Sequence, residues 1–492
     1  MRAQNPNMTN PIVDPREPSF LHSLICFGGV MVIVISGMLW LGIALHSLLV
    51  LALVWVAGHS SMLGFSYIEI KSAMIAGIQK GLGAIFIFFL IGILVAALIE
   101  SGTIGGLIYY GLDLLHPTFF LPAGLVLCSL MSLATGTAWG TIATIGVVLM
   151  GLGSALGIPL PLVAGMVVSG ASFGDKMSPV SDTTNLAAMS ADTDLYSHIK
   201  SMMYTTVPTY IISIVLFTAF GLYYSGQTLS AEELLTLKQG LEIEFTINPL
   251  TLLPLLVLLT LSLKRAPAEV SMLASVGTAL VLAVVMQDRA IPDVLNSLHA
   301  GYVASTGLEQ LDNLLSRGGI TSMMWTMSLA LIALSLGGIL DRAGFVRVLL
   351  SGMLKRIKRS ASLIAATIGA GVVSNMSMGE GYLSIIFGGQ IFKDSYEEDG
   401  LEKHMLSRTL EEGATLSTSL IPWTTSGAFI TGVLNMSPLE FAPWAFFNYL
   451  NPLLSIGLAY MGFGIFRKTQ PSDDQLSNVV GEEKTDQGIP TS

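Results

Sequence analysis

The chain has 492 residues, of which 52% are hydrophobic and only 11% charged, with a formal net charge of -10. A soluble globular protein carries about 25% charged residues, so this composition excludes that class. No basic cluster interleaved with aromatics is present, which argues against nucleic acid as a partner. Cys26 and Cys128 both lie in apolar runs and give no disulfide framework. No nucleophile–base constellation or metal-ligand spacing indicates an enzyme or a resident cofactor.

Apolar runs of about 20 residues recur along the chain, long enough to cross a bilayer as helices. We therefore expect an all-α polytopic protein of the lipid bilayer. The first run, 25–45, is too long for a signal-peptide core and lacks a small-residue cleavage site, so it predicts a retained span. The expected spans and half-spans are 22–42, 44–59, 82–100, 118–135, 139–157, 160–173, 202–224, 248–263, 267–287, 321–341, 360–376, 382–393, 416–435 and 440–466.

Two further segments are polar. Residues 289–320 predict an external amphipathic helix and loop, and they have no full counterpart in the first half. The segment from Ser472 onward is acidic and polar, which is typical of a disordered tail.

One unit is used twice along the chain. LVAALIESGTIGGLIYYGLDLL (94–115) resembles LSLGGILDRAGFVRVLLSGML (334–354), and ATGTAWGTIATI (134–145) aligns with NMSMGEGYLSII (375–386), both at an offset of 241 residues. Two later pairs bring Pro179 onto Pro422 and Pro208 onto Pro452, so the offset drifts only to 244. Four matches in the same order predict an internal repeat.

The charges predict that the two repeats are inverted, because Lys and Arg accumulate in cytoplasmic loops. The loop 100–118 has neither, whereas its partner 341–360 holds Arg342, Arg347, Lys355, Arg356, Lys358 and Arg359. The loop 225–247 is acidic, while Arg467 and Lys468 follow the second unit, and Lys264 with Arg265 marks another inside loop. Both termini are then expected in the cytoplasm. Inverted repeats are typical of secondary transporters with a site at mid-membrane depth.

The first polar interruption is SLATGTAWGT (132–141), matched by SNMSMGEGYLS (374–384). Its glycines allow tight turns, so each stretch predicts the tip of a re-entrant hairpin. The expected ion or proton ligands here are Thr135, Thr137, Asn375, Ser377 and Glu380. The alternative is a face of small residues for helix packing, which fits the glycines and threonines but fits Glu380 poorly.

The second interruption is FGDKMSPVSDTTNLA (173–187), matched by ATLSTSLIPWTTSGA (414–428). Pro179 and Pro422 break an ordinary helix, and broken helices expose carbonyls and helix ends that can hold a cation. Na⁺ is a hard cation and favours oxygen ligands. Proton coupling needs a carboxylate that holds either the ion or a proton, so Asp175 and Asp182 are the candidate Na⁺ ligands and proton carriers. The supporting candidates are Ser178, Ser181, Thr183, Thr184, Asn185, Glu412, Ser419, Thr424 and Thr425.

Structural alternatives stay open for each acid. Asp182 lies in a Ser-Asp-Thr-Thr run that also suits a helix N-cap. Asp175 can pair with neighbouring Lys176 in a loop. Arg408 lies about one helical turn before Glu411 and Glu412 and can form a salt bridge with either.

Several stretches resemble the NhaC family of Na⁺/H⁺ antiporters over roughly residues 20–466: GASFGDKMSPVSDTTNLA (170–187), LSRGG (315–319), LSRTLEEGATLSTSLIPW (406–423), TSGAF (425–429) and FAPWAFFNYLNPL (441–453). One departure concerns Tyr382. The family often has GDQYLS there, whereas this chain has GEGYLS, which keeps an acid at Glu380 but lacks the neighbouring amide.

The resemblance implies a homodimeric secondary antiporter of a prokaryotic inner membrane, with a scaffold and an elevator-like transport domain, that exchanges Na⁺ for H⁺ by alternating access without a cofactor. The family also contains exchangers of malate and lactate, which is the alternative function. A channel is a third class, against which the paired broken helices argue.

The domains expected by that analogy are a cytoplasmic N-terminus (1–20), scaffold parts (21–116 and 248–357), transport parts (117–224 and 358–466), an external loop (225–247) and a disordered cytoplasmic tail (467–492).

Overall fold

The structure, a computed structural model, describes residues 16–114, 117–224, 231–264, 266–354, 357 and 359–468. These residues form helices, with one isolated β-bridge between Leu401 and Arg467. Within these ranges nine helices are long and apolar enough to cross a membrane, or ten if the bent pair Leu235–Glu244 and Pro249–Leu263 forms one span. The prediction of an all-helical polytopic membrane protein is confirmed. Lys355, Arg356, Lys358, Arg265 and the ends beyond 16 and 468 lie outside the described residues.

The first half runs to residue 224. Its helices are α1 (Phe20–Leu39), α2 (Leu45–Met62), α3 (Tyr67–Lys80), α4 (Leu82–Glu100), α5 (Thr103–Leu114), α6 (Pro117–Thr135), α7 (Ala138–Thr141), a π-helical turn (Ile142–Gly146), α8 (Val147–Ala155), α9 (Leu160–Met177), α10 (Asp182–Ser190) and α11 (Leu195–Tyr224).

The second half begins after the helix α12 (Ala231–Glu244), which lies within the segment expected to be a loop. It contains a 3-10 turn (Pro249–Leu252), α13 (Leu253–Leu263), α14 (Ala268–Val285), α15 (Ile291–Ala300), α16 (Glu309–Leu315), α17 (Gly319–Arg342), α18 (Phe345–Leu354), α19 (Ser360–Met378), α20 (Gly381–Glu398), α21 (Lys403–Leu410), a π-helical turn (Glu411–Thr415), α22 (Leu416–Thr418), α23 (Thr425–Leu434), α24 (Pro438–Phe441), a 3-10 turn (Ala442–Trp444) and α25 (Phe446–Tyr460).

Helix α3 has no counterpart among the predicted spans, and this omission is a correction. Its first turn carries a capping box, in which Ser66 and Glu69 exchange hydrogen bonds, and Arg16 pairs with Glu69 at 2.7 Å. These charges hide the helix from a hydropathy pattern, although α3 packs along α17 and leads into α4. The break predicted at Pro422 within 416–435 is confirmed, because α22 ends at Thr418 and α23 begins at Thr425.

The first residues of matching helices agree at a constant offset of 243: α6 with α19, α7 with α20, α9 with α21 and α10 with α23. Gly136 and Gly379 both have left-handed backbones, with φ of 71° and 69°. The next residues, Thr137 and Glu380, cap the following helices with φ and ψ of −146° and 120° and of −145° and 124°. The offset of 241 predicted for this stretch is therefore wrong by two residues. The two halves share a left-handed glycine followed by an extended capping residue, and side-chain similarity does not reveal this backbone conformation.

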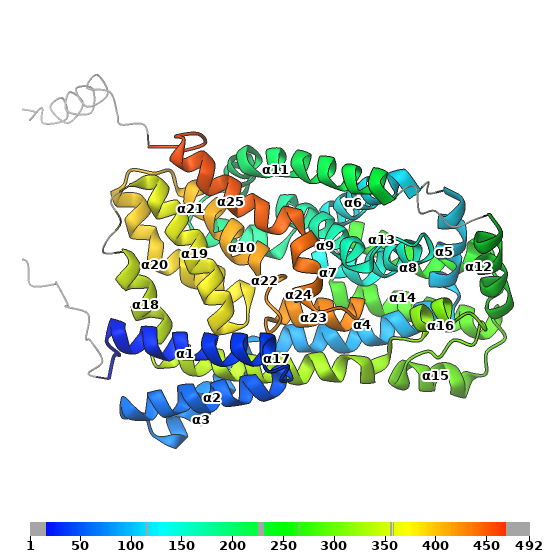
Figure 1. Ribbon diagram of the computed structural model, residues 1–492, viewed down its shortest axis with the longest axis horizontal. Helices are drawn as coiled ribbons and strands as arrows, with labels where there is room; N and C mark the ends of the chain where they lie inside the picture. Colours follow the sequence, from blue (N-terminus) through cyan, green and yellow to red (C-terminus); the bar gives the residue numbers. More distant parts are fainter. Residues whose placement is uncertain are drawn as a thin grey trace, which may run out of the picture.

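Figure 1 shows how these elements meet. Helices α6 and α8 lie toward the right of the view and α19 and α20 toward the left, and α7 and α22 lie between them. Helix α23 contacts both α7 and the π-helical turn that follows it. The helix breaks of both halves are therefore neighbours near the middle of the molecule.

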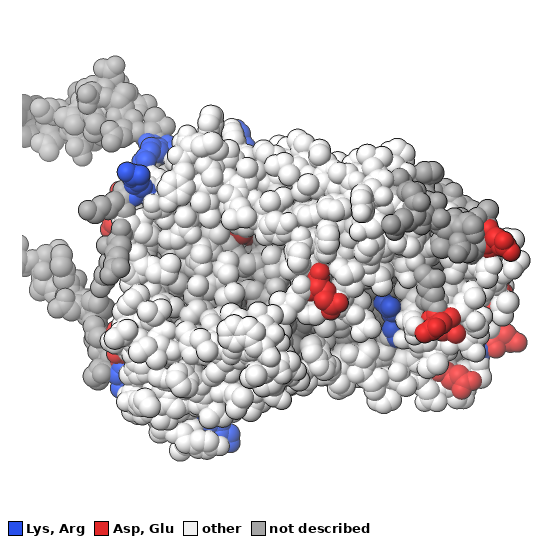
Figure 2. Space-filling model, viewed as in Figure 1, with Lys and Arg blue, Asp and Glu red and all other residues white. Residues whose placement is uncertain are grey.

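Charge gathers at the two ends of the long axis. Lys and Arg lie mainly at the left of Figure 2, and Asp and Glu lie mainly at the right. The right end holds α12, α15 and α16 in Figure 1. We call this the acid-rich end, after Glu232, Glu242, Glu244, Asp293 and Glu309 on those helices.

Buried apolar side chains form two clusters, one around α4, α6, α8 and α9 and one around α17 to α21 with α1 and α2. Three stacked rings join the halves. Trp139 lies 4.7 Å from Phe429 and 5.7 Å from Phe88 between ring centroids, with interplanar angles of 17° and 30°. The first ring belongs to α7, the second to α23 and the third to α4.

The two left-handed glycines give a matched stability test. A Cβ at Gly136 would lie 2.9 Å from the backbone C and O of Val180, whereas one at Gly379 has only ordinary contacts. Gly379→Ala is expected to cost about 1–2 kcal/mol for the left-handed backbone alone. Gly136→Ala adds overpacking of about 1–3 kcal/mol. Thermal unfolding in detergent should rank Gly136→Ala as the less stable variant, and equal midpoints would contradict the assigned turn geometry.

Candidate functional site

A cavity of about 830 Å³ lies where the helix breaks meet. Its walls come from four stretches that the sequence singled out: 135–139, 175–183, 380–383 and 415–426. Two other walls come from the start of α4 and from the turn between α13 and α14, with Lys80, Ser262 and Glu269 at its border. The cavity is therefore bordered by the helix breaks of both halves and also by α4 and the turn between α13 and α14.

Proline and hydroxyl side chains shape the two broken helices. After α9 ends, Ser178 Oγ donates to the Leu133 carbonyl at 2.8 Å, and Pro179 follows before α10 begins. In the second half, Thr424 caps α23 by accepting from Gly427 N at 3.0 Å, and its hydroxyl donates to the Ile421 carbonyl at 2.9 Å. Side chains thus bind backbone groups that a continuous helix would have satisfied.

Asp175 and Asp182 both line the cavity. Asp175 lies in the last turn of α9 and is partly buried, while Asp182 is the first residue of α10 and is exposed. Ser181, not Asp182, occupies the N-cap position, so Asp182 is not the cap that its sequence allowed. Lys176 is fully buried and does not line the cavity, and no ion pair with Asp175 is formed among the described contacts. Asp175 instead lies within electrostatic range of Asp182 and Glu411.

Glu380 connects the second hairpin tip to the second broken helix. Its carboxylate caps α20 by accepting from Tyr382 N at 3.2 Å, and it accepts from Thr425 Oγ1 at 2.6 Å. Thr425 N also donates to the Gly379 carbonyl at 2.8 Å. Glu380 is only 5% exposed, yet it lines the cavity. The packing-face alternative for this stretch does not explain a carboxylate held in this way.

The other predicted site residues fall into two groups. Thr135, Thr137, Ser181, Thr183, Ser419 and Thr425 line the cavity with the three acids. The remaining seven do not line it: Ser178, Thr184, Asn185, Asn375, Ser377, Glu412 and Thr424. Several of these brace the breaks, since Thr184 Oγ1 donates to the Lys176 carbonyl at 3.1 Å and Asn375 Nδ2 donates to the Ala414 carbonyl at 2.6 Å.

A buried charged cluster lies behind the cavity. It comprises Lys176, Arg408, Glu411 and Glu412, each at most 1% exposed. Arg408 Nε lies 3.7 Å from Glu412 Oε1 and its Nη1 donates to the Gly464 carbonyl, while Lys176 Nζ has no hydrogen-bond partner in the described structure. The cluster is tied to the first half, because Thr183 donates to Glu411 at 3.1 Å and Thr205 donates to Glu412 at 2.5 Å.

Three members of this cluster were not on the predicted site list, namely Lys176, Glu411 and Arg408. Lys176 was expected only as a partner of Asp175, and Glu411 only as one of Arg408. The buried lysine in an apolar chain was the signal for the first, and the adjacent Glu-Glu pair was the signal for the second.

The cavity wall offers mainly oxygen atoms as ligands. Carboxylates and hydroxyls line it from both halves. Within the described ranges, no group of three His, Cys, Asp or Glu side chains is arranged to hold a metal ion. Such a lining suits a hard, weakly held monovalent cation better than a tightly bound transition metal.

Comparison with known proteins identifies the same class of transporter. A family model described as the Na⁺/H⁺ antiporter family matches residues 18–184 and 170–463. The Na⁺/H⁺ antiporter NhaC of Alkalihalophilus pseudofirmus is 38% identical over 90% of this chain and 96% of its own. The malate-2H⁺/Na⁺-lactate antiporter of Bacillus subtilis is 34% identical over 91% and 96%. The arginine/ornithine antiporter ArcD of Halobacterium salinarum is 33% identical over 92% and 95%.

The buried pair of Arg408 and Glu412 gives a stability prediction. Glu412→Gln leaves the Arg408 charge uncompensated, which should destabilise the protein by about 3–5 kcal/mol. Adding Arg408→Met removes the orphaned charge and should recover part of that loss. Thermal midpoints in detergent check both, with the exposed Glu397→Gln as the matched control. A neutral Glu412→Gln would mean that the pair carries no net charge interaction.

Proposed function

The chain belongs to the Na⁺/H⁺ antiporter family as an NhaC-type secondary antiporter, and we propose that it exchanges Na⁺ for H⁺ across the membrane by alternating access. It is a multi-pass membrane transporter of the bacterial type, and not an enzyme. The observation that carries the proposal is the central cavity, in which Asp175, Asp182 and Glu380 meet hydroxyls from both halves.

The exchange follows from what a carboxylate can hold. A nearby cation favours the ionised form of a carboxylate, so Na⁺ and H⁺ compete for Asp175 and Asp182. Glu380 is held by Thr425 and by the start of α20, which suits a ligand in a fixed position. The cluster behind the cavity holds two basic and two acidic side chains, so it adds no net charge when all four are ionised. In this proposal the charge of the site changes only through the acids that line the cavity.

The arrangement of the halves supports alternating access. We interpret the helix pairs α6–α8 and α19–α20 as re-entrant hairpins of two inverted repeats, because their tips meet from opposite ends and their bounds agree at one offset. The transport parts would be 117–224 and 358–466, moving against scaffold parts 21–116 and 248–357. The cavity borders the turn after α13, which holds Lys264, so this conformation would be open to the cytoplasm.

A second function is coupled exchange of a small carboxylate such as malate or lactate. The cavity of about 830 Å³ is larger than a bare ion requires, and α10 and α23 both begin at it. Helix N-termini favour anions. One relative is named for malate and lactate, which supports this reading. We also propose a homodimer in an inner membrane, which native mass spectrometry of the detergent-extracted protein can test.

Asp175→Asn and Asp182→Asn should each lower Na⁺-driven proton flux at least ten-fold, because an amide cannot carry the exchanged proton. The measurement is the response of a pH-sensitive dye in proteoliposomes after Na⁺, Li⁺ or K⁺ is added alone and then with malate or lactate. The exposed Asp394→Asn is the matched control and should keep full flux.

Two outcomes would count against this reading. Full flux in Asp182→Asn would mean that Asp182 only begins α10 and does not carry the exchanged proton. Proton movement that requires a carboxylate besides Na⁺ would establish the second function in place of the first.

The proposed topology predicts opposite results at two fusion points. A reporter fused after Lys468 should report the cytoplasm, because the basic residues gather at that end. A reporter inserted near Glu232 in α12 should report the exterior. Paired alkaline phosphatase and fluorescent-protein fusions check both, and matching signals at the two points would refute the inverted arrangement.

A further inference from the structure

A second cavity, of about 430 Å³, lies between the start of α17 and the end of α23. Its walls include Asn313, Ser316, Arg317, Trp325 and Asn435, and no acidic residue is among them. The residues that line it are distinct from those of the central cavity. The exchange proposed above assigns no role to this second cavity.

Arg317 is the unusual residue of this cavity. Its Nε and Nη1 atoms are inaccessible to solvent and have no hydrogen-bond partner among the described residues. Burial lowers the pKa of Arg317 to about 10, which still leaves the guanidinium charged at neutral pH. Arg317 as a whole is half-buried, and enclosed polar atoms without partners are costly, so a native protein that keeps them usually has a use for them.

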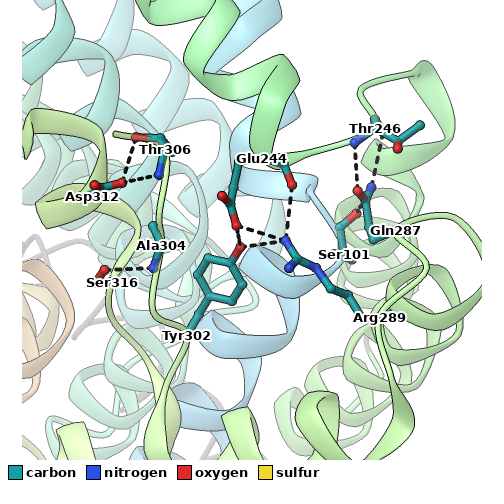
Figure 3. A network of polar contacts seen from close by, with 10 residues as sticks. All are labelled: Ser101, Glu244, Thr246, Gln287, Arg289, Tyr302, Ala304, Thr306, Asp312 and Ser316. Atoms are coloured by element: carbon teal, nitrogen blue, oxygen red, sulfur yellow. Dashed lines mark hydrogen bonds and ion pairs between the residues drawn. The ribbon is translucent and has the colours of Figure 1, made fainter. Parts of the chain in front are cut away.

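The neighbouring arginine shows the ordinary arrangement (Figure 3). Arg289 donates to Glu244 at 3.0 Å and to the Tyr302 hydroxyl at 2.8 Å, and Tyr302 in turn donates to Glu244. Burial raises the pKa of Tyr302, so the phenol keeps its proton for that bond. Arg289 is therefore paired with an acid through Nη2, although its buried Nε has no partner, whereas no ion pair is described for Arg317.

The acid nearest to Arg317 in the sequence is already engaged. Asp312 accepts from Thr306 N and from Thr306 Oγ1, both at 2.7 Å (Figure 3). These bonds lower the pKa of Asp312 and hold its carboxylate on the loop 301–308. Asp312 thus serves the loop and not the guanidinium.

The wall that carries Arg317 is held in place. The Arg317 carbonyl accepts from Tyr302 N at 3.1 Å. Ser316 Oγ accepts from Ala304 N at 3.0 Å (Figure 3). Its guanidinium is thus presented by a fixed backbone. Pre-organised donors lose little freedom on binding, which favours a ligand site.

The donors around the cavity match an anion. Asn313 and Asn435 offer amide N–H groups, and the Ser316 hydroxyl has its own proton to donate. Helix α17 begins at this wall with Gly318 as N-cap and no side-chain cap, which adds the positive end of a helix dipole. We propose that this cavity binds a small carboxylate, held by the guanidinium of Arg317. The planar fork of an arginine fits two carboxylate oxygens, a geometry that chloride cannot match.

Trp325 lines the cavity and supplies the signal for a binding test. Purified protein without Na⁺ is titrated with N-methylglucamine salts of acetate, lactate, malate and chloride at constant ionic strength. A carboxylate should change the fluorescence saturably, and Trp325→Phe should abolish that component. Arg317→Gln should weaken the apparent Kd at least ten-fold, and Arg317→Lys should lie between the two.

The matched control is Arg342→Gln, an exposed arginine at the other end of the same helix, which should bind like the wild type. If Arg317→Gln does not fold, Asn435→Asp offers a second route. Asp tolerates the left-handed backbone at 435 (φ 53°) and places a competing negative charge in the cavity. Wild-type affinity in Arg317→Gln or in Asn435→Asp, a response to chloride equal to that of the carboxylates, or no saturable response would overturn the proposal. Binding is measured without an ion gradient, so this result is independent of the flux assay.

Discussion

A helix that stops inside a membrane protein leaves backbone groups that lipid cannot satisfy. In this chain, polar side chains supply the missing partners. Thr137 accepts from Gly140 N, Glu380 from Tyr382 N and Thr424 from Gly427 N, while Ser178 donates to a carbonyl of α6. The need to satisfy broken helices therefore gathers oxygens at one depth. Acidic side chains in this region line the same cavity. The candidate site therefore lies where side chains satisfy the backbone groups of the broken helices.

The halves share this backbone but not its chemistry. At the offset of 243, Asp175 corresponds to Thr418 and Asp182 to Thr425, so the first half supplies acids where the second supplies hydroxyls. The break geometry depends on caps and left-handed turns, which several residue types can provide. Side chains that face the cavity are then free to change without loss of the fold. Relatives that cover almost the same length but are named for different cargoes fit this view.

Hydropathy, prolines and glycines predicted the helices and the two interruptions, and the resemblance of several motifs indicated the family, because these features depend on local sequence. Features that depend on which way a side chain points were missed. Lys176 follows Asp175 directly, which suggested a pair, but successive helical residues point to different sides, and α9 continues through both. Arg317 looked ordinary because its isolation depends on Asp312 being bound to Thr306, a contact decided by the loop. The sequence therefore indicated which residues could bind or ionise, but it did not indicate which partners they contact.

The stack of Phe88, Trp139 and Phe429 has a mechanical consequence. Phe88 belongs to the expected scaffold, and the other two rings belong to the expected transport parts from opposite halves. Side chains that interlock must separate before two surfaces can pass, whereas near-parallel rings keep contact while one slides over the other. In an elevator movement, Trp139 and Phe429 would travel together as one flat plate across Phe88. These rings would then stay in contact as the motion begins, so this one contact between the fixed and moving parts would not have to be broken first.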